Sequence, residues 1–336
     1  MSRLRVVLLL VILFLLGSCG ERKDSETVRL DSGIVLDSEL QLPTIMQIYG
    51  DYLAVVDLFS EGKIMKLYDL SSGKIVSEFG VKGEGPGEFL HVSSLDFSME
   101  DGQLMLHVLD PVRSLLTTYR VSELEKGIAD GNIRKVSDGG LRLTELYRTD
   151  GGYLATGIFT QGKYALFDDS LRFCGYEGAY LVNEQGVQDS VRHAIANNGT
   201  LVFSKDKGEC AEIIYMASVL NFNRMDGNHV TRQSEYVIKP LNYRLDGEAI
   251  VNNEVDGYLS GSYGRSHIYA LYVGVPESDD IATYGSTIHV FSRDGVLEKR
   301  MELDRSAFRI CVNEDESTLY VLSHDPDAGI WKYSIR

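Results

Sequence analysis

Two aspartates recur at matching places in the first part of the chain and could hold a cation or an axial ligand. Asp57 follows the apolar pair Val55-Val56, and Asp110 follows Val108-Leu109. An aspartate at the end of a strand also caps a neighbouring turn, because its carboxylate accepts hydrogen bonds from backbone N–H groups. We favour this structural interpretation of both residues over a ligand site.

Oxygen-bearing side chains later in the chain could supply a calcium site. Calcium takes six to eight oxygen ligands, mainly from carboxylates and amides. The candidates are Glu254 in the run Asn252-Asn253-Glu254, the pair Asn197-Asn198, and Asp325. No regular spacing brings these residues together, so we expect no metal and no cofactor, and calcium is the one alternative.

Aromatic side chains offer a different kind of site. Five tyrosines lie beside or within the long segment 274–286: Tyr258, Tyr263, Tyr269, Tyr272 and Tyr284. Tyrosine rings present apolar faces with a polar tip, and long loops often carry recognition. We therefore expect a binding surface here. The sequence contains no G-x-S-x-G nucleophile elbow, and no catalytic set is predicted.

An internal repeat indicates the elements that position these residues. Six Gly, Asp or Asn turns are each followed by an apolar run with a leucine near its start, and the steps between these leucines are 51, 50, 47, 58 and 60 residues. The leucines are Leu53, Leu104, Leu154, Leu201, Leu259 and Leu319. Six repeats of about fifty residues predict an all-β, six-bladed β-propeller with four-stranded antiparallel blades. We interpret the six turns as links between the first and second strands of each blade.

A second series of turns is expected to join the third and fourth strands of blades one to five. It comprises Ser72-Gly73, Asp130-Gly131, Asp169-Ser170, Asp226-Gly227 and Asp294-Gly295. After Leu319 the chain has room for only two more strands, so the sixth blade lacks an outer strand. Residues 27–37 are predicted to supply it and to close the ring, which removes open sheet edges. Residues 27–336 would form one domain.

One glycine-rich motif carries a family resemblance. Residues 83–89 read Gly-Glu-Gly-Pro-Gly-Glu-Phe and resemble the interblade segment of NHL-type propellers. The chain as a whole resembles the TolB-like six-bladed propeller lipoproteins of the Bacteroidetes. A phosphate-binding loop would need a helix and normally a Lys-Ser/Thr pair after the glycines, and neither follows. The motif residues Gly83, Gly85, Pro86, Gly87, Glu88 and Phe89 are therefore assigned a structural role between blades.

The chain begins with a segment typical of export. Arg3 and Arg5 precede the apolar run 6–16, and Leu16-Gly17-Ser18-Cys19 resembles the lipobox of bacterial lipoproteins. The resemblance implies a signal peptide over 1–18 and lipidation of Cys19, followed by a flexible tether over 19–26. The protein would then be lipid-anchored in the cell envelope, at the outer membrane, with surface exposure as a finer expectation. Without lipidation, Cys19 would belong to an ordinary secretory peptide.

The charge balance restricts the partners. The chain has 33 Lys and Arg against 49 Asp and Glu, a formal net charge of −16. So acidic a protein does not favour nucleic acid or anionic lipid surfaces, and membrane contact is expected through the lipid anchor only. We expect Cys174, Cys210 and Cys311 to be buried thiols; one disulfide with one free thiol is the alternative.

These features predict a monomeric, non-catalytic binding or scaffold lipoprotein. It would recognise a protein, peptide or glycan through one propeller face. The alternative is a calcium-dependent hydrolase or lyase with an axial site, because calcium-dependent lactonases share the six-bladed architecture.

Overall fold

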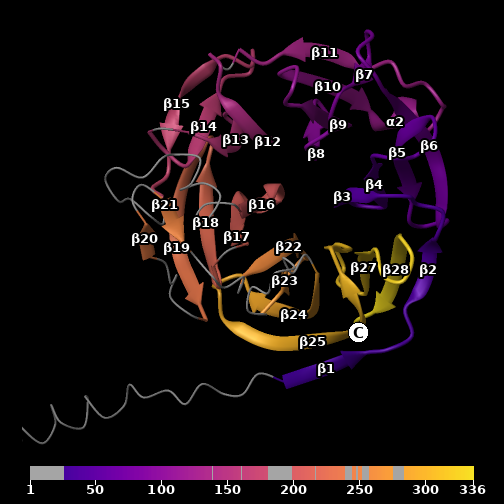
Figure 1. Ribbon diagram of the computed structural model, residues 1–336, viewed down its shortest axis with the longest axis vertical. Coiled ribbons are helices and arrows are strands. Elements are labelled where there is room, and N and C mark those ends of the chain that lie inside the picture. Colours follow the sequence, from indigo (N-terminus) through magenta and orange to yellow (C-terminus); the bar gives the residue numbers. More distant parts are fainter. Residues whose placement is uncertain are drawn as a thin grey trace, which may run out of the picture.

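A computed structural model of the protein places six small sheets around a central axis (Figure 1). The structure describes residues 26–137, 139–159, 161–180, 199–215, 217–238, 244–246, 249–251, 257–274 and 284–336. The predicted signal peptide, Cys19 and all of the tether except Glu26 lie outside these residues. The predicted six-bladed β-propeller is confirmed.

Each blade is a four-stranded antiparallel sheet whose first strand lies nearest the axis (Figure 1). The inner strands are β3 (Pro43–Tyr49), β8 (Ser94–Glu100), β12 (Arg142–Thr149), β16 (Gly199–Ser204), β22 (Tyr258–Tyr263) and β26 (Arg309–Val312). The second strands are β4 (Tyr52–Asp57), β9 (Gln103–Asp110), β13 (Gly152–Ile158), β17 (Glu209–Ile214), β23 (His267–Tyr272) and β27 (Thr318–Ser323). The third strands are β5 (Lys63–Asp69), β10 (Leu115–Arg120), β14 (Tyr164–Phe167), β18 (Val219–Asp226), β24 (Gly285–Ser292) and β28 (Gly329–Ser334). The outer strands are β6 (Lys74–Lys82), β11 (Asn132–Lys135), β15 (Phe173–Glu177), β19 (His229–Val237), β25 (Leu297–Ala307) and β2 (Ile34–Asp37).

Neighbouring blades pack face to face through apolar side chains. The second strands are the most deeply buried, as in β4, where every residue after Tyr52 is buried. Such strands are covered on both faces and read as continuous apolar runs. Between blades one and two, the Phe79 and Tyr119 rings meet edge to face with centroids 5.1 Å apart. The core is therefore a ring of interblade layers around the axis.

The N-terminal segment closes the ring, as predicted, but in two pieces. Strand β2 pairs antiparallel with β28 and completes blade six. Residues 26–30 instead form β1 (Glu26–Leu30), which runs parallel to β25 on the outside of blade five (Figure 1). The break falls at Ser32, whose φ of 67° lies in the left-handed region and whose N–H donates to Asp304 at 3.1 Å. The expected single strand over 27–37 is thus corrected to two strands on two blades.

Asp37, the last residue of β2, ties the closing strand to blade one. Its Oδ2 accepts a hydrogen bond from the Tyr68 hydroxyl at 2.6 Å and one from Lys66 Nζ at 3.2 Å. The side chains of Asp37 and Lys66 are both 8% exposed. The first and last blades are therefore joined by a nearly dry ion pair as well as by strand pairing.

The predicted assignment of the first turn series is correct for four blades and wrong for blades four and five. Gly199 is the first residue of the inner strand β16, and Gly257 immediately precedes the inner strand β22. Neither glycine follows its inner strand, as the prediction required. In blade four the first and second strands are joined by the 3₁₀ turn η2 (Lys205–Lys207) and by Gly208 at φ 59°. The segment 205–215 therefore holds η2 and the regular second strand β17. The second turn series joins third and fourth strands as predicted.

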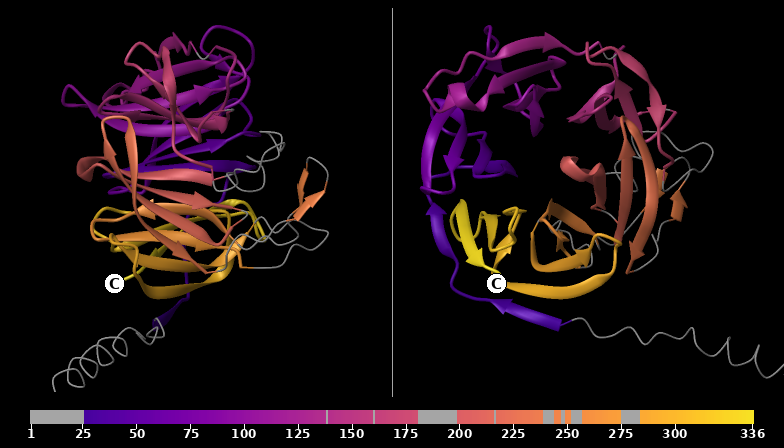
Figure 2. Two further views of the ribbon diagram at one scale, coloured as in Figure 1. Left: turned by 90° about the vertical axis from the view of Figure 1, so that its left-hand side faces the viewer. Right: turned by 180° about the vertical axis from the view of Figure 1, so that it is seen from behind.

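Two short elements stand outside the blades. A short helix, α2 (Val121–Leu124), follows β10. Strands β20 (Arg244–Asp246) and β21 (Ala249–Val251) pair as a separate hairpin that stands apart from the ring (Figure 2). Across the described part of the chain, no helix is both long enough and apolar enough to cross a bilayer.

The three cysteines of the propeller are free thiols. Cys210 on β17 and Cys311 on β26 are buried, as expected. Cys174 is exposed, which corrects the expectation of three buried thiols. The reason is its place on β15, an outer strand whose early residues face solvent.

Candidate binding site in the axial channel

The direction of the strands defines two faces of the disc. All inner strands begin on one face, and the antiparallel second strands end there. We call this the entrance face. The connections that lead into inner strands, and those between second and third strands, therefore lie on the entrance face.

A cavity of about 620 Å³ opens on the entrance face at the axis. All six blades contribute to its wall, which places it on the axis rather than between two blades. Its apolar lining includes Ile45, Leu58, Leu143, Leu259 and Phe308. The volume falls within the range of about 300–1,000 Å³ that is typical of small-molecule sites.

Two opposite charges face this cavity from opposite blades. Glu145 belongs to β12 of blade three, and Arg309 begins β26 of blade six. Both residues are followed by the same contact with the inner strand of the preceding blade. The backbone N–H of Leu146, next to Glu145, donates to Ser94 at 3.2 Å. The backbone N–H of Ile310, next to Arg309, donates to Ser260 at 3.1 Å. Glu145 and Arg309 therefore occupy the same repeat position, half a turn apart around the ring.

The Glu145 carboxylate is held by hydroxyl groups. Its Oε1 accepts from Thr200 Oγ1 at 2.8 Å and its Oε2 from Thr156 Oγ1 at 3.1 Å. Burial raises the pKa of this carboxyl, against the lowering effect of those hydrogen bonds and of the Arg309 charge. The Tyr147 hydroxyl is a third donor to this carboxylate. Three donors leave at least one of its four lone pairs available to a ligand.

The Arg309 guanidinium has few partners of its own. Its Nη1 donates to the Phe308 carbonyl at 3.0 Å and, more weakly, to the Leu259 carbonyl at 3.4 Å. The group lies 4.1 Å from the centroid of the Phe308 ring. Burial lowers the pKa of Arg309, and Glu145 partly offsets this effect. No carboxylate of the described residues forms an ion pair with Arg309, and the two acceptors that its guanidinium contacts are uncharged carbonyls.

Exposed apolar side chains stand beside the cavity on blades one and two. Phe59 and Val112 are 59% and 65% exposed, and each follows a cavity-lining residue, Leu58 or Pro111. Leu42 and Leu90, both 36% exposed, lie in the connections that lead into β3 and β8. We call Leu42, Phe59, Leu90 and Val112 the apolar rim. Exposed apolar groups that gather on one face of a protein can mark an interaction site.

Asp57 and Asp110 position this rim. Asp57 accepts hydrogen bonds from the backbone N–H groups of Gln41 and Leu42 at 3.0 and 2.7 Å. Asp110 accepts from the N–H of Leu90 at 2.8 Å. Both aspartates are 1% exposed. Their side chains thus serve the connecting loops, in keeping with the structural interpretation favoured from the sequence.

Of the five tyrosines expected to form one binding surface, the structure brings together Tyr258 and Tyr272, whose ring centroids are 5.2 Å apart. Tyr258 is buried at the wall of the axial cavity, and its hydroxyl contacts His289 Nδ1 at 2.9 Å. Tyr263 lies at the other end of β22, below the Arg293 guanidinium. Tyr269 is buried and Tyr272 stacks on His289, with centroids 4.7 Å apart. Tyr284 alone of the five is exposed, at 38%.

The glycine motif joins blade one to blade two. Its last two residues, Glu88 and Phe89, form β7, which pairs parallel with β6. The Glu88 carboxylate accepts from the Gly85 N–H at 2.8 Å, and a Cβ on Gly83 would lie 2.1 Å from that carboxylate. Gly87 has φ of 77°, in the region that favours glycine. The motif therefore folds around its own glutamate, and Phe89 enters the core.

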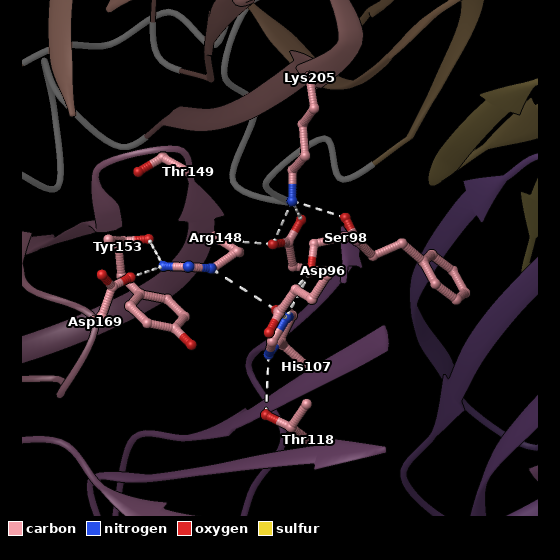
Figure 3. A network of polar contacts seen from close by, with 12 residues as sticks. Asp96, Ser98, His107, Thr118, Arg148, Thr149, Tyr153, Asp169 and Lys205 are labelled. Carbon is pink, nitrogen blue, oxygen red and sulfur yellow. Dashed lines mark hydrogen bonds and ion pairs between the residues drawn. The ribbon is translucent and has the colours of Figure 1, made fainter. Parts of the chain in front are cut away.

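A second polar network lies at the far end of the channel (Figure 3). Lys205 of blade four reaches Asp96 of blade two, with Nζ 2.6 Å from both carboxylate oxygens, and the Phe97 carbonyl at 2.7 Å. Arg148 of blade three donates to Asp169 at 2.6 Å and, through its backbone N–H, to Asp96 at 2.7 Å. Blades two and four are not neighbours, so the Lys205 contact bridges the channel at this end.

The same network contains a Ser-His-Glu set that does not have the geometry of a catalytic triad. Ser98 Oγ and Glu100 Oε1 both lie 2.8 Å from His107 Nε2, while Nδ1 contacts Thr118 at 3.0 Å. A triad needs the nucleophile and the acid on different ring nitrogens. Ser98 and His107 are 4% and 2% exposed, which leaves no access for a substrate. The hydrogen bond from His107 lowers the pKa of Glu100 to about 2. We assign this set a structural role.

The residues considered for calcium do not assemble within the described structure. Asn197, Asn198 and residues 252–254 lie outside it, and Asp325 Oδ2 accepts from Ser306 at 3.3 Å. No group of three or more His, Cys, Asp or Glu side chains suited to a metal ion occurs in the described ranges. The chemistry that the described channel offers is therefore ligand binding by one arginine, one carboxylate, His91, several hydroxyl groups and apolar side chains.

Sequence reasoning did not identify Glu145 or Arg309. Each stands in an otherwise apolar or hydroxyl-bearing stretch with no motif around it. A blade-by-blade alignment of inner strands would have shown charges at one axis-facing position of blades three and six. That alignment requires the correct strand register, which the turn pattern misassigned in blades four and five.

Comparisons with known proteins agree with this fold. A sequence model of the TolB-like 6-blade propeller-like family matches residues 23–315. No curated protein matches. Among solved structures, a Bacteroides fragilis protein described as exported has a TM-score of 0.59 at 11% identity, with 92% of this chain and 98% of that chain covered. A member of the DUF4221 family from Bacteroides vulgatus has a TM-score of 0.55 at 10% identity, over 91% and 94% of the two chains. The calcium-binding protein regucalcin from Agrobacterium tumefaciens has a TM-score of 0.53 at 12% identity, over 93% and 95%. At these identities, the likenesses establish the fold alone.

Proposed function

This chain belongs to the TolB-like 6-blade propeller-like family, and we propose that it is a non-catalytic binding protein that recognises a peptide or protein segment on its entrance face. The observation that carries the proposal is that the apolar rim and the axial cavity lie on the same face of the propeller. Phe59 and Val112 are exposed directly beside Leu58 and Pro111, which line the cavity. A segment could thus pack apolar side chains on the rim and insert its end into the channel.

The character of the rim favours a peptide over a glycan. Leu42, Leu90 and Val112 are aliphatic, and Phe59 is the one aromatic member. Carbohydrate recognition relies on aromatic faces combined with a dense set of polar groups, whereas aliphatic patches mark contacts with protein. The rigid loops held by Asp57 and Asp110 also reduce the entropy that binding must overcome.

The same proposal places the protein in the cell envelope. The basic and apolar start of the chain and the lipobox-like residues before Cys19 support export followed by lipidation. Two or more acyl chains would anchor it stably at the outer membrane, since one chain gives only marginal binding. The acidic surface supports a contact with the membrane through this anchor alone.

Peptide arrays test the proposal. The full chain in detergent is applied to an array of synthetic peptides that present free C-termini, and binding is compared with that of a Phe59→Ser/Val112→Ser variant. We expect wild-type binding to peptides rich in apolar residues and a loss of at least tenfold in the variant, because two exposed apolar contacts near the centre of the surface are removed.

Val296→Ser is the matched control. Val296 is 60% exposed in the turn between β24 and β25, on the face opposite the rim. This variant should bind like the wild type. Equal losses in both variants, or the absence of peptide binding by the wild type, would refute recognition by the entrance face.

A further inference from the structure

Arg309 is the one lysine or arginine among the described residues that line the axial cavity. Its hydrogen-bond partners are the backbone carbonyls of Leu259 and Phe308, which carry no charge. Arg309 is partly buried and has no carboxylate in contact, so its charge loses part of its hydration without the compensation that an anion would supply. The cavity is therefore complementary to an anionic group of a ligand.

The surroundings limit that group to a single negative charge. One guanidinium binds one carboxylate through two parallel hydrogen bonds, which is its preferred geometry. Across the channel stands the Glu145 carboxylate, whose field reaches Arg309. A dianion such as a phosphate, or a second carboxylate, would approach Glu145 without a second lysine or arginine among the described lining residues to compensate it. The apolar wall formed by Leu143, Leu259 and Phe308 suits a hydrocarbon side chain next to the ligand's charge.

On the basis of the proposed function, we propose that the axial cavity binds a peptide through one carboxylate, which pairs with Arg309 while Glu145 excludes ligands with a second negative charge. The carboxylate can come from a free C-terminus or from a single acidic side chain. The apolar rim then holds the residues that precede it.

The test uses pairs of synthetic peptides with the same apolar sequence. Each sequence is made as the free acid, as the C-terminal amide, and as an amide that contains one aspartate. Binding to the full chain is measured by fluorescence anisotropy at pH 8 for the wild type, Arg309→Gln and Arg232→Gln. Arg232 is the matched control, because it is an exposed arginine on the outer strand β19, in an ion pair with Glu235.

We expect the wild type and Arg232→Gln to prefer a carboxylate peptide over the plain amide by roughly tenfold to a hundredfold, the worth of a hydrogen-bonded ion contact. Arg309→Gln should bind acid and amide alike. A preference for the free acid alone identifies a C-terminus as the source, and equal binding of the aspartate amide identifies a side chain. Equal binding of acid and amide by the wild type, or an undiminished preference in Arg309→Gln, overturns the inference while peptide binding itself stands.

Glu145→Gln supplies a second readout that does not depend on how well the arginine variant folds. The change keeps the side-chain size and an oxygen acceptor but removes the negative charge. Peptides that end in aspartate with a free C-terminus carry two charges, and they should bind this variant at least fivefold tighter than the wild type. An unchanged or weaker affinity for these peptides contradicts the role assigned to Glu145.

Discussion

Removal of the Asp37 carboxylate should open the ring at its only non-consecutive blade junction. Asp37→Ala deletes the acceptor for Lys66 Nζ and for the Tyr68 hydroxyl, 3.2 and 2.6 Å away. Strand β2 is short, and three residue pairs join it to β28. The link between this strand and blade one therefore depends strongly on one side chain.

The size of the effect follows from burial. The Lys66 side chain is 8% exposed, so the variant would leave a cation largely dehydrated and without its carboxylate. Breaking a buried pair by removing one partner costs about 3–5 kcal/mol. Lys66→Met in the same background removes that uncompensated charge, and it should recover a large part of the loss. Asp37→Asn retains an oxygen acceptor for Tyr68 and should lie between the wild type and Asp37→Ala.

These differences in stability can be measured by urea unfolding, monitored by tryptophan fluorescence. Trp331 on β28 reports on the junction because it pairs with Val35 of the closing strand. The midpoint should fall in Asp37→Ala with little change in the slope, and it should rise again in the double variant. A midpoint for Asp37→Ala that corresponds to a loss below about 1 kcal/mol would refute the reasoning. The reasoning would also be refuted if the Asp37→Ala/Lys66→Met variant lost more free energy of unfolding than the two single variants lose together.

Two further predictions concern titratable groups. His289 is 3% exposed, and burial lowers its pKa to about 4 from 6.5, so the unfolded chain takes up the proton first. The stability from this neutral histidine is complete above pH 6.5 and is lost as the pH falls to 4, by about 3 kcal/mol. Calorimetric melts should show this loss in the wild type and not in His289→Gln; parallel pH curves would contradict it. Burial also raises the pKa of Cys210 and Cys311 to about 12, whereas Cys174 is exposed. Because thiolates react with iodoacetamide, mass mapping at pH 8 should find native labelling at Cys174 and labelling of the other two only after unfolding; early labelling of Cys311 would argue against a buried inner strand.

The architecture was predictable because propeller blades repeat local turn chemistry. Asp and Gly turns recur about every fifty residues, since left-handed turn positions favour these residue types. The series fails where a blade uses another turn. Lys205–Lys207 forms a 3₁₀ turn ended by Gly208, and its sequence does not resemble the other hairpins. The turn pattern therefore assigns the Asp-Gly pair before β22 to the link between the first and second strands of blade five, whereas this pair precedes the first strand.

The closing segment shows a similar limit. Residues 27–37 have the composition of a strand, and their place at the end of the ring followed from counting strands. Their division into β1 and β2 depends on one left-handed residue, Ser32, and on its contact with Asp304, which is 272 positions away. Serine carries no turn signal as strong as glycine, so tertiary structure decides the break.

Tertiary structure also decides where side chains gather. Tyr258, Tyr263 and Tyr269 are close in sequence, but strands of a blade run between the two faces and alternate their side chains, so neighbours in sequence point to different surroundings. The opposite holds for Glu145 and Arg309, which are far apart in sequence and share the axis. A closed ring brings equivalent positions of all six blades to one channel, and this closure depends on the whole fold rather than on any local pattern.

The two ends of the channel differ in how their charges are satisfied. At the far end, Lys205 contacts both oxygens of Asp96, and Arg148 contacts Asp169, so cations and anions form direct ion pairs within the structure. At the entrance, Arg309 contacts backbone carbonyls and Glu145 contacts hydroxyls, although the two charges influence one another. Direct pairing at the far end makes that network a part of the scaffold. Separation at the entrance leaves both charges able to contact a third group, and the exposed apolar rim lies on this face. The asymmetry supports the proposal that recognition occurs at the entrance, whereas the opposite end supports the scaffold.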